Sequence, residues 1–176
     1  PTDMGGFAAS AFKRGIRFIN IPTTLLSMVD ASVGGKTGIN FEGYKNEIGV
    51  FNQAHAVLVD TSFLDTLDYD NLRSGFAEMI KHTLIYSAQA WESLQNFDFT
   101  NPDVSALKPL VADSITIKEF FVDADPTEKG IRKALNFGHT IGHAIESFAL
   151  KSGKPLLHGF AVAYGMVGEL YLSHTK

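Results

Sequence analysis

The stretch Leu135-Asn136-Phe137-Gly138-His139-Thr140-Ile141-Gly142-His143-Ala144-Ile145-Glu146 has helical periodicity and carries two histidines four residues apart. Residues at this spacing share one face of a helix, so the two imidazoles would be neighbours. Asn136 lies three positions before the first histidine, and Arg132 lies four before Asn136, so both extend the same face. Gly138 and Gly142 each cost about 1 kcal/mol relative to alanine inside a helix. We therefore predict a polar functional face and a second element packed closely against this backbone.

The histidine spacing is typical of a metal site. Zinc favours histidine nitrogen and carboxylate oxygen, and catalytic zinc keeps one coordination position open. By spacing alone, His139 and His143 are the first-choice pair, and His158, at the start of the next predicted helix, is a third candidate ligand. Glu78 lies among apolar residues in Ala77-Glu78-Met79-Ile80-Lys81-His82. Since burying a bare carboxylate is costly, Glu78 is either paired or bound to a metal. The alternative is a solvated surface pair with Lys81.

The glycine-rich segment Asp30-Ala31-Ser32-Val33-Gly34-Gly35-Lys36-Thr37-Gly38 suggests anion binding. It is not a nucleoside-triphosphate loop, because G-x-x-x-x-G-K-[ST] requires glycine where Asp30 stands, and a carboxylate there would repel phosphate. We predict a turn or loop over 34–38 that presents Lys36 to an anion, with Lys45 and Asn46 in the next glycine-bounded loop. A solvated loop is the alternative. The chain contains no G-x-G-x-x-G pattern for a dinucleotide.

The sequence changes character near residue 70. Short apolar runs alternate with glycine-rich turns before this point, and helical periodicity dominates after it. In the first part we predict helices over 7–13 and 25–31 and strands over 17–21 and 56–59. In the second part we predict helices over 70–87, 88–97, 104–122, 131–149 and 159–174. This pattern predicts an α/β remnant over 1–69, followed by a mostly α-helical domain over 70–176.

Composition narrows the functional class. The 176 residues are 45% hydrophobic and 19% charged, which indicates a packed core. A formal net charge of −4 argues against sequence-independent binding to nucleic acid. The absence of cysteine excludes disulfides and thiolate ligands. No apolar run approaches the roughly 20 residues of a membrane span. We therefore expect a cytoplasmic enzyme, or part of one, with no nucleic-acid or membrane partner.

The segment Ile21-Pro22-Thr23-Thr24-Leu25-Leu26-Ser27-Met28-Val29-Asp30-Ala31-Ser32-Val33-Gly34-Gly35-Lys36-Thr37-Gly38 closely resembles a signature of the 3-dehydroquinate synthase family, within the sugar-phosphate cyclases. Residues 77–82, 135–146 and His158-Gly159 match the same family in the same order. The resemblance implies the end of an NAD-binding α/β region followed by a helical metal-binding domain. It also implies that the chain is a fragment, incomplete at both ends and inactive alone.

The resemblance assigns roles to individual residues. It places the zinc ligands at Glu78, His139 and His158, so His143 becomes a substrate-side group. It places the NAD contacts at Asp3, Thr23, Thr24, Lys36, Lys45, Phe63, Leu64, Asp65 and Thr66. It places the substrate contacts at Asp30, Lys36, Asn46, Lys81, Lys118, Arg132, Asn136 and His143. Arg14 matches an arginine that reaches the neighbouring subunit's substrate, which implies a homodimer. Members often carry glutamate where Phe160 follows His158-Gly159, which leaves open what supports His158.

The resemblance also implies the reaction. Such enzymes are lyases of the shikimate pathway, which leads to the aromatic amino acids. They use NAD and Zn²⁺, or Co²⁺, to convert 3-deoxy-D-arabino-heptulosonate 7-phosphate into 3-dehydroquinate and phosphate. The alternatives are a sister cyclase of the inosose or valiolone type, a metal-dependent alcohol dehydrogenase and a helical metal-binding module without activity. Lys118 and Arg132 favour the synthase, because both suit a substrate carboxylate, which the sister substrates lack.

Overall fold

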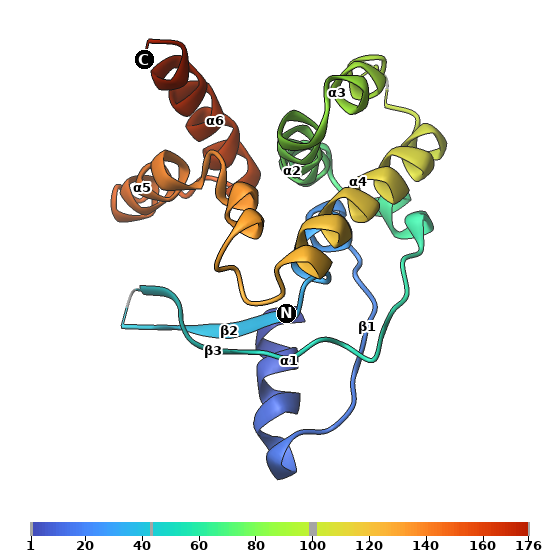
Figure 1. Ribbon diagram of the computed structural model, residues 1–176, viewed down its shortest axis with the longest axis vertical. Coiled ribbons are helices and arrows are strands. Elements are labelled where there is room, and N and C mark those ends of the chain that lie inside the picture. Colours follow the sequence, from blue (N-terminus) through green and yellow to red (C-terminus); the bar gives the residue numbers. More distant parts are fainter. Residues whose placement is uncertain (1, 43, 99–101, 176) are drawn as a thin grey trace.

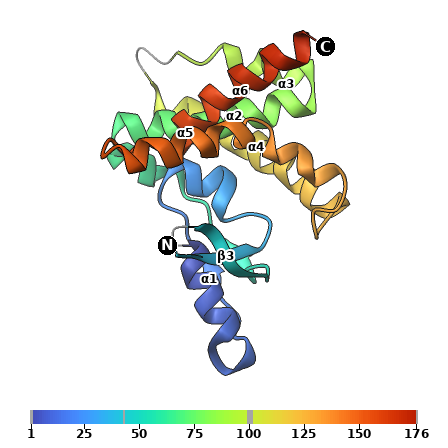
Figure 2. The same cartoon turned by 90° about the vertical axis from the view of Figure 1, so that its left-hand side faces the viewer.

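The computed structural model describes residues 2–42, 44–98 and 102–175. It places α1 and two small sheets on one side of a layer of helices (Figures 1 and 2). The first part contains α1 (Thr2–Ala11), η1 (Phe12–Arg14), β1 (Ile19–Asn20), η2 (Ser27–Ala31), β2 (Lys36–Phe41), β3 (Tyr44–Phe51), β4 (Ala56–Val57) and η3 (Thr61–Thr66). The second part contains α2 (Tyr69–Tyr86), α3 (Ala88–Gln95), α4 (Val104–Ala124), η4 (Ile131–Asn136), α5 (His139–Lys151) and α6 (His158–His174). The predicted fold class is confirmed, while the domain boundary near residue 70 stays a prediction.

The strands predicted over 17–21 and 56–59 are present but short. β1 pairs with β4 in parallel, with Ile19 opposite Ala56 and Asn20 opposite Val57. Side chains flanking this pairing, including Ile19 and Leu58, are more than half exposed. Because parallel strands share one direction, the segments that follow β1 and β4 leave from the same edge of the sheet.

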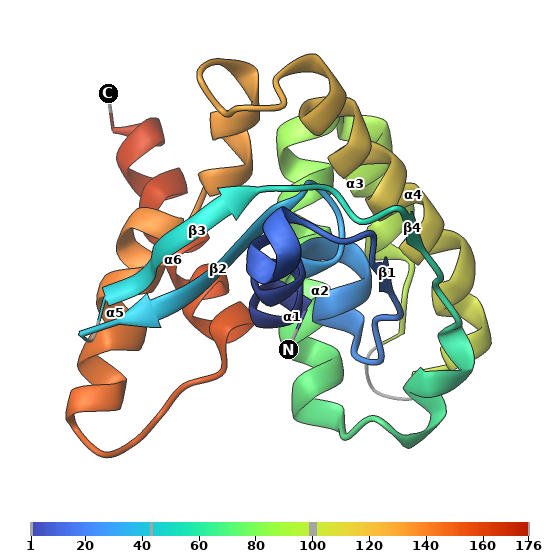
Figure 3. The same cartoon turned by 90° about the horizontal axis from the view of Figure 1, so that it is seen from below.

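The prediction of loops around Lys36 and Asn46 is wrong, because both residues lie in an antiparallel hairpin. β2 pairs with β3 from Lys36 opposite Phe51 to Phe41 opposite Tyr44, and Gly38 faces Gly49. A Cβ on Gly49 would lie 2.3 Å from the backbone oxygen of Thr37, so the strands approach closely where both residues are glycine. The turn itself is confined to Gly34 and Gly35, which both have left-handed φ values. Figure 3 shows the hairpin crossing below α5 and α6.

The single helix predicted over 131–149 is also wrong. The short 3₁₀ helix η4 ends at Asn136, and α5 begins at His139. Gly138 between them has a left-handed φ of 78°, which interrupts the helical path. Arg132 and Asn136 therefore do not share a helix face with His139 and His143.

The helix predicted over 25–31 is present in a modified form. It begins as a short α-helical turn and continues as the π-helical turn η2, in which Ser32 donates its backbone N–H to the carbonyl oxygen of Ser27. Met28 and Val29 are fully buried in the main core, together with Leu25. The same turn leaves Asp30 facing α4. Single π turns occur often at functional sites.

The long helices lie where they were expected. Asp68 caps α2, since its side chain accepts a hydrogen bond from the backbone of Asn71, and Asp103 caps α4 through Ser105. Ser87 ends α2 and caps α3. None of the described helices combines the length and apolar composition that crossing a bilayer requires.

Three helices meet at glycine contacts. A Cβ on Gly165 of α6 would lie 1.9 Å from the backbone oxygen of Gly138, at the start of α5. A Cβ on Gly159 would lie 1.8 Å from the backbone oxygen of Ser74 in α2, and the Ser74 hydroxyl accepts a hydrogen bond from the backbone of Gly159. These contacts confirm that another element packs closely against the histidine-bearing helix. They fix the start of α5 against α6, and the start of α6 against α2.

Candidate active site

A pocket of about 770 Å³ lies between the hairpin and the helices, within or near the size range of small-molecule sites. Eleven of the predicted site residues line it, although they come from nine different elements. They are Asp3, Asp30, Lys36, Asn46, Lys81, Lys118, Arg132, Asn136, His139, His143 and His158. The structure thus brings together the predicted substrate contacts and two of the three predicted zinc ligands.

The third predicted zinc ligand, Glu78, is fully buried against the wall of this pocket. Its Oε1 lies 3.8 Å from Nε2 of His139 and 3.6 Å from Nε2 of His158. Atoms that bind one zinc ion tetrahedrally at about 2.0–2.1 Å are about 3.4 Å apart. Neither Glu78 oxygen has a hydrogen-bond partner among the described residues, although Oε2 forms an ion pair with Lys81. Two imidazoles and a carboxylate with unsatisfied oxygens fit a divalent metal.

His139 is held in the form that binds metal. Its Nδ1 lies 3.2 Å from the backbone oxygen of Phe137, which leaves Nε2 facing Glu78. Burial and the charge of Lys81 lower the pKa of His139 to about 4. The ring is therefore neutral near pH 7, as metal coordination requires.

His143 remains beside this group. Nitrogen atoms of His139, His143 and His158 lie within 4.8 Å of one another, so an all-histidine set is also geometrically available. His143 is exposed, whereas Glu78 has no access to water that could solvate its charge. Lys81 pairs with Oε2 of Glu78, but the buried Oε1 faces the two imidazoles with no hydrogen-bond partner among the described residues, which favours Glu78 over His143 as the third ligand.

The positively charged side chains of the pocket each have an internal carboxylate partner. Lys36 forms an ion pair with Glu128, and Lys81 forms one with Glu78. Arg132 is almost fully buried, and its Nη1 and Nη2 donate to the backbone oxygens of Pro126 and Gly34. Its Nε has no hydrogen-bond partner among the described residues and lies 3.8 Å from Glu128 Oε2. An anionic ligand would therefore compete with carboxylates already present.

Asp30 and Lys118 form the third such pair. The Lys118 ammonium lies 2.6 Å from Asp30 Oδ1 and also donates to the Asp30 backbone oxygen. Burial alone would raise the pKa of Asp30, but the ammonium groups of Lys118 and Lys81 hold it well below its usual value. Burial lowers the pKa of Lys118, and Asp30 opposes that shift. Asp30 is therefore ionised near pH 7, and its charge favours the protonated form of Lys118.

Of the remaining predicted residues, those whose side chains the structure describes do not line the pocket. Thr23 and Thr24 follow β1, and the 63–66 turn lies in η3, which follows β4. Both segments thus leave the carboxyl edge of the parallel sheet, where nucleotides bind in open α/β sheets. The Leu64 side chain is in the hydrophobic core, so only its backbone can contact a ligand. Arg14 borders a separate surface pocket beyond α1. Lys45 lies in β3, and its side chain is outside the part of the structure described.

Three carboxylates near the site escaped the sequence prediction. Glu128 accepts a hydrogen bond of 2.7 Å from Asn136 Nδ2 and has a left-handed φ of 58°, which no sequence signal indicated. Glu146 lies 3.4 Å from Nδ1 of His158. Its position seven residues after His139, two helical turns along the same face, could have indicated it. Glu169 contacts the start of α5 from α6.

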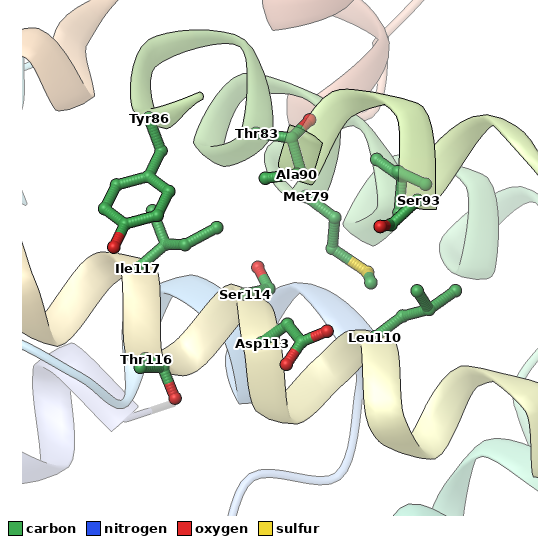
Figure 4. Close-up of a pocket in the computed structure, with 11 residues that line it drawn as sticks. Met79, Thr83, Tyr86, Ala90, Ser93, Leu110, Asp113, Ser114, Thr116 and Ile117 are labelled. Atoms are coloured by element: carbon green, nitrogen blue, oxygen red, sulfur yellow. The ribbon is translucent and has the colours of Figure 1, made fainter. Parts of the chain in front are cut away.

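A second pocket lies between α2, α3 and α4 and is smaller, about 180 Å³. Figure 4 shows Met79 extending from α2 toward Leu110 of α4, with Ser114 between the helices. Asp113 is the one charged side chain among its lining residues. This pocket lacks the grouped cations and imidazoles of the larger one.

His82 contacts Ser114 in the buried interior, and its titration predicts how the stability of the protein depends on pH. His82 Nδ1 is 2.8 Å from the Ser114 hydroxyl. Burial and the charge of Lys81 lower the pKa of His82 well below its usual value. Below about pH 6.5, His82 therefore binds a proton in the unfolded chain but not in the folded chain. The free energy of unfolding then falls as the pH falls, by up to about 1.4 kcal/mol per pH unit for one proton.

In metal-free protein, His82 and His139 both contribute to this dependence of stability on pH. We therefore expect His82→Gln to remove only the contribution of His82, about one proton between pH 6.5 and 5. The measurement is chemical denaturation in chelator at several pH values. His174→Gln, at an exposed position, is the control. An unchanged slope in His82→Gln would show that His82 titrates normally.

Comparisons with known proteins match this chain to one family. The family model for the N-terminal part of 3-dehydroquinate synthase matches residues 1–74, and the model for its C-terminal part matches residues 75–176. A 3-dehydroquinate synthase from Parabacteroides distasonis is 60% identical over 173 residues, which are 98% of this chain and 49% of that protein. One from Dictyoglomus thermophilum is 45% identical over 98% of this chain and 48% of that protein. The chain spans about half the length of the curated relatives it matches.

Solved structures show the same fold. A 2-epi-5-epi-valiolone synthase from Streptomyces hygroscopicus, with NAD⁺ and Zn²⁺ bound, is 31% identical with a TM-score of 0.76, over 94% of this chain and 46% of that one. A 2-deoxy-scyllo-inosose synthase complexed with carbaglucose-6-phosphate, NAD⁺ and Co²⁺ is 29% identical with a TM-score of 0.79, over 92% of this chain and 44% of that one. Because the two family models together match residues 1–176, this chain belongs to the 3-dehydroquinate synthase family.

Proposed function

We propose that the protein is a 3-dehydroquinate synthase, a lyase of the shikimate pathway that converts 3-deoxy-D-arabino-heptulosonate 7-phosphate into 3-dehydroquinate and phosphate. The observation that carries this proposal is one pocket in which four cationic side chains surround a buried carboxylate and three imidazoles. The substrate is a polyol with a phosphate at one end and a carboxylate at the other, so it has a complementary charge for each part of this pocket.

We propose that Glu78, His139 and His158 hold Zn²⁺ or Co²⁺. The unsatisfied oxygens of buried Glu78 and the neutral His139 ring support this assignment. When bound, the metal would lower the pKa of a substrate hydroxyl, and NAD⁺ would accept and later return a hydride. The cofactor residues are proposed to be Asp3, Thr23, Thr24, Lys36, Lys45 and residues 63–66. The placement of Thr23, Thr24 and residues 63–66 beyond the carboxyl ends of β1 and β4 supports this role.

The remaining side chains of the pocket bind and orient the substrate. We assign the phosphate to Lys36, Asn46, Lys81 and His143, and the substrate carboxylate to Lys118 and Arg132. The buried Nε of Arg132 has no hydrogen-bond partner among the described residues, and Lys118 would exchange part of its contact with Asp30 for the substrate. We assign Asn136 and Asp30 to the substrate hydroxyl groups that lie between the phosphate and the carboxylate. Holding the phosphate beside the proton to be removed could contribute several kcal/mol through proximity alone.

Two further elements of the proposal concern the assembled enzyme. Arg14 is exposed, outside the pocket, and follows α1 with a left-handed φ of 67°. We propose that it serves the neighbouring subunit of a homodimer in the cytoplasm. Size-exclusion chromatography with light scattering on a full-length protein carrying this chain tests the dimer, and a monomer would contradict it.

Lys118 provides the test that separates the synthase from the sister cyclases. We expect Lys118→Met, in a full-length protein carrying this chain, to raise the KM for the heptulosonate phosphate about 10- to 100-fold, because a charge-assisted hydrogen bond is worth about 1.5–3 kcal/mol. Since the variant leaves Asp30 without its partner, Asp30→Asn/Lys118→Met serves as the charge-balanced second variant. Lys108→Met, exposed on the same helix, is the control. An unchanged KM in both Lys118 variants would remove the carboxylate assignment.

A further inference from the structure

Helices α5 and α6 each carry a carboxylate that contacts the other helix beside a proposed zinc ligand. Glu146 is on α5, and its Oε2 lies 3.4 Å from Nδ1 of His158, the first residue of α6. Glu169 is on α6, and its Oε2 accepts a hydrogen bond of 2.8 Å from the backbone nitrogen of Gly138, directly before His139. The two contacts run in opposite directions across one packed helix pair (Figure 1).

The contact from Glu146 selects which nitrogen of His158 faces the metal position. An ionised carboxylate accepts hydrogen bonds but cannot donate one, so in this contact Nδ1 of His158 is the donor and carries the hydrogen. The lone pair then lies on Nε2, which is 3.6 Å from Glu78 Oε1. Carboxylate partners of this kind orient metal-binding histidines and raise their basicity. Phe160 stands where family members often carry a glutamate that could support His158. Here that support comes from Glu146 on α5 rather than from the helix that carries His158.

The contact from Glu169 fixes the turn that carries His139. The first backbone N–H groups of a helix have no partner within it. Glu169 accepts from Gly138 at 2.8 Å and from Ile141 at 3.5 Å, where a negative charge is also favoured by the helix dipole. His139 is in turn oriented by the backbone oxygen of Phe137 in the same turn. Holding the Gly138 amide therefore holds the His139 ring.

We propose that Glu146 and Glu169 are positioning residues of the metal centre, each placing the ligand carried by the opposite helix. The proposal rests on the metal site proposed above. The helix pair itself is already held by glycine contacts at Gly142 and Gly165. The two carboxylates act at the ends of the helices that carry the ligands.

The test uses a full-length protein carrying this chain with Glu146→Gln or Glu169→Gln, and Glu92→Gln on exposed α3 as the matched control. Zinc affinity is measured by competition with a chelator, and ligand geometry by the visible spectrum of the Co²⁺-loaded protein. We expect each variant to lose about 10- to 100-fold in zinc affinity and to shift the Co²⁺ bands. The control should match the parent protein in both.

A second readout requires no metal. In metal-free protein, ¹⁵N shifts of the His158 ring report its tautomer, and hydrogen exchange reports the Gly138 amide. Glutamine at 146 can donate to Nδ1 as well as accept from it, so we expect a mixed tautomer in that variant alone. We expect exchange at Gly138 to rise about tenfold or more in Glu169→Gln alone.

The outcomes separate the two proposals. Parent-like zinc affinity and Co²⁺ spectra in both variants would overturn the positioning roles and leave the metal site intact. If the parent protein itself binds no zinc, the proposed metal site fails. The positioning roles are then decided by the metal-free readouts: a changed tautomer and faster exchange support them, and unchanged values overturn them.

Discussion

Replacing Glu78 by alanine is expected to remove both bound zinc and turnover from a full-length protein carrying this chain. Glu78 is fully buried, and its Oε1 lies within 3.8 Å of both His139 and His158. No other described carboxylate reaches both imidazoles at this distance. The measurement is zinc content by mass spectrometry after dialysis, together with phosphate release. We expect zinc to fall to background and activity to fall below detection.

The same substitution leaves Lys81 buried without its ion-pair partner, which costs about 3–5 kcal/mol and could unfold the protein. His139→Ala is therefore the second variant, because the His139 side chain is partly exposed and is not paired with Lys81. Circular dichroism checks that it remains folded. Glu92→Ala, at an exposed site, is the control. Retained zinc with full activity in folded His139→Ala would refute the ligand assignment.

Gly165→Ala is expected to be strongly destabilising, although alanine is the better helix former by about 1 kcal/mol. Its Cβ would lie 1.9 Å from the backbone oxygen of Gly138, and a backbone oxygen cannot move away unless α5 moves with it. Overpacking of this kind costs about 1–3 kcal/mol or more. Moving α5 also displaces His139 from Glu78. We expect a lower free energy of unfolding and weaker zinc binding together.

Gly5→Ala is the matched control, because Gly5 lies in α1 and its added Cβ would meet nothing within 4 Å. We expect this variant to be as stable as the parent protein, or up to about 1 kcal/mol more stable. Urea denaturation of both variants provides the comparison. A Gly165→Ala protein as stable as Gly5→Ala, with parent-like zinc affinity, would show that the helix pair can separate without cost.

The sequence predicted the positions of the long helices because their caps and apolar periodicity are local signals. Asp68 and Asp103 each begin a helix in the way their side chains favour. The errors arose at glycines. Gly38 and Gly49 suggested loops but face one another within a hairpin, and Gly138 suggested a helix interior but lies between η4 and α5. A glycine allows several backbone conformations, and the choice among them depends on tertiary packing.

The candidate site was predictable to a different degree. Residue patterns placed His139 and His143 together and offered His158 and Glu78 as candidates, but only the resemblance selected Glu78 and His158 over His143. The segment 131–149 is not one helix, but its predicted site residues still lie together, because η4 and α5 both border the same pocket. Glu128 could not have been predicted, since its approach to Lys36 depends on a loop in which a non-glycine residue has a left-handed φ.

Phosphate release tests the central claim most directly. A full-length protein carrying this chain, with NAD⁺ and Zn²⁺, is offered the heptulosonate 7-phosphate, sedoheptulose 7-phosphate and glucose 6-phosphate separately, while NADH absorbance is followed. We expect release from the heptulosonate phosphate alone, with no net NADH. Release from another sugar phosphate would contradict the roles of Lys118 and Arg132 and indicate a sister cyclase. Net NADH without phosphate release would indicate a dehydrogenase instead.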